Sequence, residues 1–344
     1  MQEKQNNKKK YLPKISIVII GINVEKYIKD CLDSILNCNY PSSHLEIIYS
    51  DGGSKDKTLE IIKSYKQIKV INLKRDNPTP GNGRNEGAKQ ATGEFIQFMD
   101  ADTILSADWF NLSLPYLKNS TQAIWGRRLE RYPDKNIFHK IGNFEWAIMG
   151  DGSTGHQSGT ARSFGGDVLM SKSAFHTSEG YDIDLVAGED PDFSYRFRKA
   201  GFLIYRLNES MTLHDLNMNS FLQYWKRSMR SGHAYAEIAF RYMRSEEKLF
   251  LREFLRIFLG TIFIFGLFSI SYFTPFSIPM MVLGLLIFLR PFARIFHLRK
   301  KTNSNWDFLL KYCSHLSFVI IPQFLGSIRF MITWFGYPKI KNSR

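Results

Sequence analysis

Residues 95–102, FIQFMDAD, decide the fold, because a mostly apolar run of the kind that forms a buried strand leads directly into two carboxylates. Apolar runs alternate with amphipathic stretches on both sides of it, from residue 15 to about residue 125. We expect strands at 15–20, 45–49, 70–73 and 95–99, and helices at 25–36, 57–65 and 83–91. Alternating strands and helices predict an α/β fold, an open and mostly parallel sheet flanked by helices.

Asp100 and Asp102 follow the fourth expected strand. The carboxyl ends of strands form the usual ligand crevice of an open α/β sheet. Hard oxygen ligands suit Mg²⁺ or Mn²⁺, which commonly take one or two protein carboxylates plus substrate phosphates. Two acids in a loop are more often a solvated turn or a helix cap, and we expect Asp108 to cap the next helix. The pair therefore needs support from other motifs.

A second polar turn, residues 50–56 (SDGGSKD), ends the second expected strand. Its glycines allow a close backbone turn, and Asp51 can accept a hydrogen bond from a base or ribose. The alternative is an ordinary turn in which Ser54 or Asp56 caps the following helix, which we expect for those two residues. Asn23 is available as a cap near the start of helix 25–36.

In order and spacing, four segments resemble the family 2 glycosyltransferases: residues 16–27 (SIVIIGINVEKY), 50–58 (SDGGSKDKT), 81–93 (GNGRNEGAKQATG) and 98–102 (FMDAD). The resemblance covers most of residues 15–215. It implies a GT-A nucleotide-sugar-binding fold and transfer of a sugar, with inversion, from a nucleotide-diphosphate donor to an acceptor hydroxyl.

The resemblance also implies roles for single residues. Asp51 would contact the nucleobase, Arg84 would lie near the base or a phosphate, and Asp100 would approach the ribose. Asp102 would bind the cation, Mn²⁺ or Mg²⁺. Asn23 and Glu25 occupy positions where the family lines the nucleoside pocket.

Residues 188–196 (GEDPDFSYR) and the downstream His214 look like the family's Glu-Asp motif and histidine. Single-step displacement needs a carboxylate that accepts the acceptor's proton, a role we assign to Asp190 with Glu189 in support. Both acids would also complement the dipole of a helix that starts there. His214 would contribute to the metal or diphosphate site, or be structural. Asp167, in a segment resembling the sugar-site floor, would bind hydroxyls or stabilise a turn.

Residues 257–289 contain no charged residue, and one helix of that length, at about 1.5 Å per residue, exceeds a hydrocarbon core of about 30 Å. A break at Thr274, Pro275 and Pro279 would give two legs, about 254–273 and 276–289. A buried hairpin of a soluble domain is the alternative. Residues 308–335 are apolar but interrupted, which leaves an interfacial segment or a third span open.

Basic residues flank both ends of this hairpin and predict that the N-terminal part lies on the cytoplasmic side, against an anionic leaflet. The net charge of +14 also fits nucleic acid, but lipid explains the flanking charge more simply, so we expect no nucleic-acid partner. No secretion signal is visible, and three cysteines without metal or redox spacing predict buried thiols.

The chain therefore divides into a basic tail (1–13), a catalytic GT-A domain (14–245) and a membrane-associated helical region (246–344). The expected partners are a nucleotide-diphosphate sugar, a glycan or lipid-linked acceptor, and the membrane. A non-catalytic membrane protein that binds a nucleotide sugar is the alternative. It would keep the nucleotide pocket and lack the base.

Overall fold

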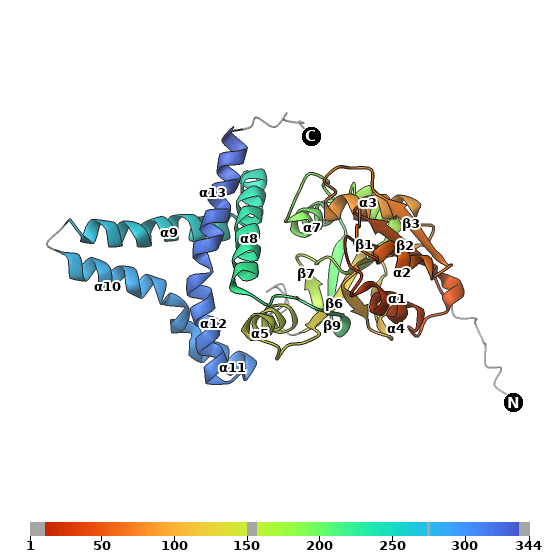
Figure 1. The fold of residues 1–344 in the computed structure, drawn as a ribbon, viewed down its shortest axis with the longest axis horizontal. Helices are drawn as coiled ribbons and strands as arrows, with labels where there is room; N and C mark the ends of the chain where they lie inside the picture. The colour runs from red at the N-terminus through yellow and green to blue at the C-terminus, as the bar shows by residue number, and fades with distance from the viewer. Residues whose placement is uncertain (1–10, 150–156, 274–275, 337–344) are drawn as a thin grey trace. The chain divides into compact units, whose positions relative to one another are not determined.

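The computed structural model describes residues 11–149, 157–273 and 276–336 (Figure 1). It forms two compact units. The first comprises Met1–Lys135, Gly142–Leu185 and Glu189–Leu216, and the second comprises Asn136–Ile141, Val186–Gly188 and Asn217–Arg344. Residues 1–10 of the predicted basic tail (1–13) lie outside the described residues.

The first unit is built on a nine-stranded sheet with the order β3-β2-β1-β4-β8-β6-β9-β5, to which β7 adds by pairing with β9. Its strands are β1 (Ile15–Gly21), β2 (Leu45–Asp51), β3 (Ile68–Asn72), β4 (Phe95–Asp100), β5 (Thr103–Leu105), β6 (Thr121–Glu130), β7 (Gly159–Ala161), β8 (Val168–Ser171) and β9 (Leu203–His214). All four strands expected from the sequence are confirmed.

The α/β class is confirmed, but the expectation of a mostly parallel sheet is wrong beyond β4. Strands β3, β2, β1 and β4 are parallel, and β6 is parallel to β9. In contrast, β8 is antiparallel to both β4 and β6, and β5 and β7 are antiparallel to β9. The sheet is mixed because the chain after β4 returns through strands that pair with partners far away in sequence.

Helices cover the parallel half of the sheet, and their apolar faces explain their positions. Helix α1 (Ile28–Leu36) buries Ile28, Cys31, Leu32 and Ile35 on one face, as the 3.6-residue period predicts. Helix α3 (Pro80–Gln90) begins three residues before the expected start, because Thr79 caps it and Pro80 occupies its first turn. The other helices of this unit are α2 (Thr58–Lys63), α4 (Trp109–Ser113), α6 (Lys172–Thr177) and α7 (Glu189–Lys199).

Three expected caps are wrong. Asn23 has a positive φ of 53° and its side chain accepts a hydrogen bond from the Lys55 backbone, while α1 starts five residues later. Asp108 precedes α4 but accepts from the Asn39 side chain instead of capping. Ser54 donates to Asp51, whereas Asp56 does accept from Thr58 at the start of α2, as expected.

The second unit is helical. It contains α8 (Phe221–Tyr242), α9 (Leu251–Ser271), α10 (Ser277–Phe288), α11 (Ile295–Thr302), α12 (Trp306–Phe318), α13 (Ile320–Gly336) and the 3₁₀ turn η4 (Arg290–Arg294). Helix α5 (Ile137–Asn143) contributes its first residues. Helices α8 and α13 pack closely, since a Cβ on Gly232 would collide with the backbone of Gln323 (Figure 1).

Two helical segments of the described chain are long and apolar enough to cross a membrane, Leu251–Ser271 and Trp306–Phe335. A third span would need α10 together with residues 290–302, a pair bent by 49°. The two predicted legs agree with α9 and α10, although Thr274 and Pro275 lie outside the described residues. The segment at 308–335, left open by the sequence, is long enough to span. The three cysteines are free and buried, as predicted.

Candidate active site

The carboxyl ends of β1, β2 and β4 meet at one edge of the sheet. Gly21 pairs with Asp51 on one side of β1, and Ile20 pairs with Asp100 on the other. The two carboxylates expected to hold a nucleoside therefore lie at neighbouring strand ends, in the crevice where open α/β sheets bind ligands.

Asp51 stabilises its own turn. Its buried carboxylate accepts hydrogen bonds from the Gly53 and Ser54 backbone N–H groups, both at 2.9 Å, and from the Ser54 hydroxyl at 2.6 Å. The turn-stabilising role that the sequence analysis reserved for Ser54 and Asp56 thus belongs to Asp51 as well. Contact with a nucleobase stays a prediction for this residue.

Asn23 and Glu25 hold the same turn from the opposite side. The Asn23 side chain accepts from the Lys55 backbone N–H at 2.8 Å, and the Glu25 carboxylate accepts from the Lys57 backbone N–H at 3.0 Å. Both residues therefore fix the shape of the loop after β2. Their predicted place in the nucleoside pocket is not tested by these contacts.

Arg84 connects three of the predicted site carboxylates. Its guanidinium, 3% exposed, lies 2.9 Å from Asp100, 3.3 Å from Glu189 and 3.8 Å from Asp190. The guanidinium also lies over the Tyr181 ring, 5.2 Å from its centroid. Arg84 extends from α3, Asp100 ends β4, and Glu189 and Asp190 start α7, so one buried cation joins three separate segments.

Two neighbouring residues, Gly166 and Asp167, support this cluster. A Cβ at Gly166 would lie 2.5 Å from the Arg84 guanidinium and 3.0 Å from the Asp100 carboxylate, so only glycine permits that approach. The neighbouring Asp167 is buried and accepts from the Asp100 backbone N–H at 3.0 Å and from the Thr212 hydroxyl at 2.7 Å. These contacts favour the structural alternative for Asp167 over sugar binding.

Arg128, in β6, is a site residue that the sequence analysis missed. Its guanidinium lies 3.2 Å from Asp100, 4.0 Å from Asp102 and 3.8 Å from Asp167. It also lies over Trp146, 5.6 Å from the ring centroid. Its only sequence signal is the Arg-Arg pair at 127–128, in a region without a recognisable motif.

Asp102 and His214 lie together at the ends of β4 and β9. His214 Nε2 is 3.3 Å from Asp102 Oδ2, and the His214 ring contacts Trp146 edge-on at 5.1 Å. Asp102 Oδ1 and His214 Nδ1 are buried and have no hydrogen-bond partner among the described residues. A carboxylate oxygen and an imidazole nitrogen suit Mn²⁺, so these two residues fit the predicted cation.

Burial and the charges of the cluster shift the pKa values of Asp190 and Asp100 in opposite directions. Burial and the neighbouring Glu189 raise the pKa of Asp190 to about 8. Burial opposes ionisation of Asp100 too, but Arg84 and Arg128 outweigh it and hold the pKa of Asp100 below its usual value. One carboxyl is thereby poised to exchange a proton near neutral pH while the other stays ionised, an arrangement typical of acid–base sites.

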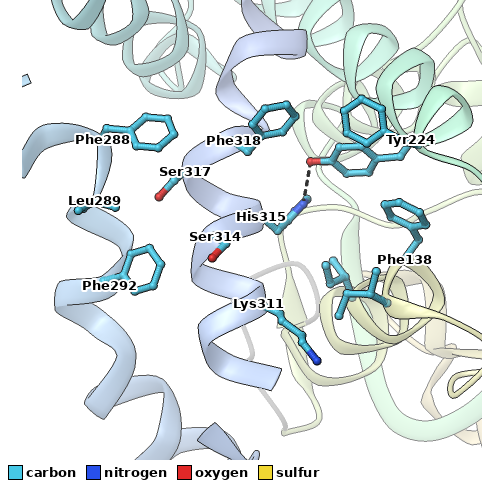
Figure 2. Close-up of a pocket in the computed structure, with 13 residues that line it drawn as sticks. Phe138, Tyr224, Phe288, Leu289, Phe292, Lys311, Ser314, His315, Ser317 and Phe318 are labelled. Atoms are coloured by element: carbon cyan, nitrogen blue, oxygen red, sulfur yellow. Dashed lines mark hydrogen bonds between the residues drawn. The ribbon is translucent and has the colours of Figure 1, made fainter. Parts of the chain in front are cut away.

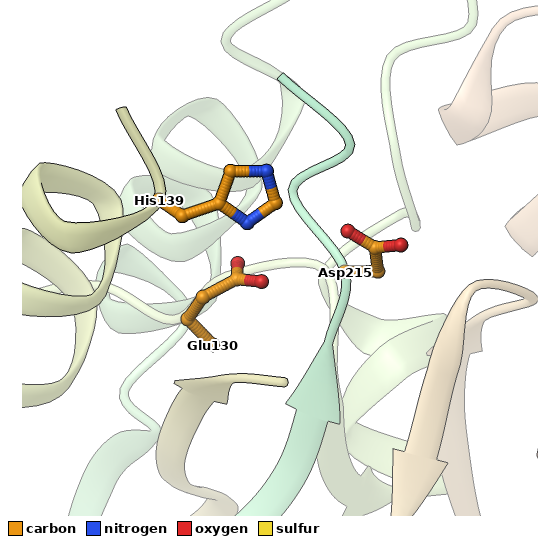
Figure 3. A group of neighbouring side chains, drawn as sticks. All are labelled: Glu130, His139 and Asp215. Atoms are coloured by element: carbon orange, nitrogen blue, oxygen red, sulfur yellow. The ribbon is translucent and has the colours of Figure 1, made fainter. Parts of the chain in front are cut away.

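Figure 3 shows Glu130, His139 and Asp215, which also have side chains of metal-binding types. Glu130 ends β6, and its carboxylate accepts from the backbone N–H groups of Tyr132 at 3.1 Å and Leu216 at 3.0 Å. This acid therefore stabilises the chain that follows β9. His139 belongs to the second unit and the two acids belong to the first, so we assign no metal to them.

The family model for glycosyl transferase family 2 matches residues 16–175, which contain β1 to β8 and the Asp100–Asp102 motif. The chain carries a family 2 glycosyltransferase domain. The match ends before α7, so the Glu189–Asp190 pair lies beyond the matched region.

Curated relatives match parts of the chain. A Staphylococcus aureus relative, poly(ribitol-phosphate) beta-N-acetylglucosaminyltransferase TarS, is 35% identical over 98 residues, which are 28% of this chain and 17% of the relative. The poly-beta-1,6-N-acetyl-D-glucosamine synthase of Staphylococcus epidermidis is 32% identical over 190 residues, 53% of this chain and 45% of the relative. The dolichyl N-acetyl-alpha-D-glucosaminyl phosphate 3-beta-D-2,3-diacetamido-2,3-dideoxy-beta-D-glucuronosyltransferase of Methanococcus voltae is 26% identical over 244 residues, 64% of this chain and 72% of the relative. The matched part therefore spans about one sixth of the first relative.

Two solved structures resemble the chain in fold. The mannosyltransferase PcManGT of Pyrobaculum calidifontis, in complex with GDP-Man and Mn²⁺, has a TM-score of 0.61 at 14% identity and covers 93% of this chain and 88% of that one. TarS residues 1–349 of S. aureus, in complex with UDP-GlcNAc, has a TM-score of 0.54 at 16% identity, covering 95% and 93%. Both confirm the GT-A architecture.

Proposed function

We propose that this protein transfers a sugar from a nucleotide-diphosphate donor to an acceptor hydroxyl with inversion at the anomeric carbon. The observation that carries the proposal is the Arg84 cluster, in which Asp100 from the nucleotide-binding half lies on the same guanidinium as Glu189 and Asp190. The proposed donor-binding residue and the proposed base therefore contact the same side chain, which supports the proposal. A protein that only binds nucleotide sugars does not need a base such as the Glu189–Asp190 pair.

Asp190 is the proposed base. As the acceptor oxygen attacks the anomeric carbon from the face opposite the diphosphate, Asp190 takes the hydroxyl proton. The new carbon–oxygen bond forms, the bond to the diphosphate breaks, and the nucleoside diphosphate leaves. A carboxyl with a pKa raised to about 8 is a stronger base than an ordinary aspartate.

Asp102 and His214 are the proposed cation ligands. When bound there, Mn²⁺ or Mg²⁺ would neutralise charge on the leaving diphosphate. Arg128 lies beside the same acids and supplies a fixed positive charge at this end of the site. Asp51, Asn23 and Glu25 would form the nucleoside side of the pocket through the turn that they stabilise.

The proposed acceptor is a glycan or a lipid-linked glycan at the cytoplasmic face of a membrane. In support, the names of two relatives specify poly(ribitol phosphate) and a dolichyl-linked sugar phosphate as what those proteins act on, and the name of a third specifies poly-N-acetylglucosamine as what it makes. The membrane-length helices and the basic residues at their ends favour attachment to an anionic leaflet. Carbonate extraction that releases the intact chain would contradict this attachment.

Calorimetry with UDP and GDP, each with and without Mn²⁺, tests the donor site. We expect one nucleotide to bind, with affinity that depends on Mn²⁺ and is lost in Asp102→Ala. Binding of a nucleotide without any release from its sugar conjugate would favour the non-catalytic alternative. Absence of binding by either nucleotide would contradict both functions.

A further inference from the structure

The second unit contains a cavity of about 520 Å³ with a mostly aromatic wall (Figure 2). Phe288 and Phe292 close it on one side, and Phe138, Phe221 and Phe318 close it on another. A volume of this size is typical of small-ligand sites, which are predominantly apolar with a few polar groups that fix orientation. The cavity is therefore large enough for part of an apolar ligand.

A second cavity of about 290 Å³ adjoins the first, because Phe288 lines both. Its wall comes from α9, α10 and α13 and is apolar apart from Thr261. These helices include the two segments that are long enough to cross a membrane.

Most of the polar groups in the wall come from α12, which contributes Lys311, Ser314, His315 and Ser317; His315 pairs with the Tyr224 hydroxyl of α8 at 2.9 Å. Figure 2 shows the Ser314 and Ser317 oxygens pointing toward the segment of Phe288 and Phe292, whereas the Lys311 side chain points to the side of Phe138. The Ser317 side chain is 3% exposed, and its hydroxyl has no hydrogen-bond partner within the described ranges. A buried hydroxyl without a partner is costly, so a ligand that brings an acceptor oxygen to Ser317 is favoured.

Lys311 also lines the cavity and lies about 9 Å from Ser317 along the helix axis, since it is six residues earlier. The Lys311 ammonium pairs with Asp307 at 2.8 Å, but both side chains are mostly exposed, and exposed pairs of this kind exchange easily. Arg290 and Arg294 of η4 add exposed positive charge after α10. An anionic head group is therefore expected near Lys311.

We propose that the cavity binds one acyl chain of an anionic glycerophospholipid. The chain lies among the phenylalanines, an ester oxygen accepts from the Ser317 hydroxyl, and the phosphate faces Lys311. A ligand that reaches both residues needs an acceptor oxygen at Ser317 and a separate anionic group at Lys311. A glycerophospholipid has both, an ester and a phosphate, whereas an isoprenyl phosphate has only the phosphate. This inference rests on the membrane attachment proposed above and is independent of sugar transfer.

Trp225 provides the readout, because its ring packs against Phe221 and Phe318 of the cavity wall at 5.8 and 5.9 Å. The experiment titrates the full-length protein in detergent with phosphatidylglycerol carrying brominated acyl chains, which quench nearby tryptophan. We expect saturable quenching that Trp225→Phe removes and that unlabelled phosphatidylglycerol reverses.

Two variants make the site assignment specific. Ser317→Phe fills the cavity and should abolish the saturable quenching, whereas Leu310→Phe, on the exposed face of the same helix, should leave it unchanged. Ser317→Ala removes only the hydroxyl and should weaken binding about threefold to tenfold, the effect of one hydrogen bond. The alanine variant keeps the test valid if the phenylalanine variant fails to fold.

Equal quenching in the wild type and both Ser317 variants would overturn the proposal. Reversal by an isoprenyl monophosphate at lower concentration than by phosphatidylglycerol would overturn the choice of lipid. Because the readout involves no nucleotide sugar, an inactive enzyme with intact quenching would contradict only the proposed transfer reaction, and an active enzyme without quenching would contradict only the lipid site.

Discussion

Replacing Asp190 with asparagine isolates the proposed base. The side chain keeps its shape and loses the ability to accept a proton at neutral pH. Arg84, which lies 3.8 Å from Asp190, keeps its closer partners Asp100 at 2.9 Å and Glu189 at 3.3 Å. We therefore expect the fold and the nucleotide site to survive the substitution.

The ionised fraction of Asp190 and the usual rate contribution of a general base set the expected loss of transfer activity. With a pKa of about 8, roughly one Asp190 in ten is ionised at pH 7 in the free protein. General-base assistance is worth about 10²- to 10⁴-fold in rate. Sugar transfer by Asp190→Asn should fall by that factor, while nucleotide affinity changes by less than about threefold.

The assay pairs a product measurement with calorimetry on the same preparations. Asp192→Asn is the matched control, because Asp192 lies on the same helix but pairs with Arg196 at 2.7 Å, so its transfer rate should stay near that of the wild type. Normal transfer by Asp190→Asn would refute the reasoning and return the base role to Glu189. Loss of nucleotide binding along with transfer would make Asp190 part of the donor site instead.

Four further predictions test other parts of the account. Because only ionised Asp190 accepts a proton, kcat/KM for the acceptor should rise about tenfold per pH unit below about pH 8 and level off above it, as a pH–rate profile would record. Asp102→Ala should abolish Mn²⁺-dependent turnover without lowering the thermal midpoint, because this carboxylate at a strand end packs little. Arg128→Gln should lower the free energy of unfolding by about 1–3 kcal/mol, since it leaves neighbouring acids unbalanced, and added Mn²⁺ should restore part of it in urea titrations. A chain that ends at Asn219 lacks the membrane-length helices and should be found in the supernatant after carbonate extraction. A chain that ends at Arg244 keeps α8 without its packing partner α13, so the exposed apolar face of α8 should make it aggregate.

A specific outcome would contradict each of these four predictions. A kcat/KM that does not change between pH 6 and 8 would remove Asp190 from the rate-determining proton transfer. Near-native turnover of Asp102→Ala at saturating Mn²⁺ would remove the metal assignment. Arg128→Gln with unchanged stability, or without any response to Mn²⁺, would show that Arg128 and the cation do not share the same acids. A soluble chain ending at Arg244 would show that α8 does not need α13.

The parallel half of the sheet could be predicted because its signal is local. Buried central strands such as β1 have continuous apolar runs, and the amphipathic period of α1 is visible within nine residues. The other half could not be predicted, because β6 and β9 pair across more than seventy residues and no local pattern records such a pairing. The starts of helices α1 and α4 were predicted less accurately for a related reason. The side chains of Asn23 and Asp108, expected as caps, instead form hydrogen bonds with residues far away in sequence.

Motif spacing correctly identified the acids that gather at the site, because Asp100, Glu189 and Asp190 each stand in a recognisable segment. It could not show that Arg84 binds all three, since its partners come from segments up to about a hundred residues away. Arg128 was missed entirely because a single arginine in a strand has no pattern of its own. Only the fold reveals that three acids surround it.

The most direct test of the central claim is a turnover screen of nucleotide-diphosphate sugars with the full-length protein, with Mn²⁺ or Mg²⁺, measuring release of the nucleoside diphosphate. The account predicts cation-dependent release from donors of one nucleobase, lost in Asp102→Ala and reduced about 10²- to 10⁴-fold in Asp190→Asn when acceptor is present. Release that needs neither the cation nor Asp190 would contradict the account, as would binding of a nucleotide sugar without any release in the presence of membrane-derived acceptors.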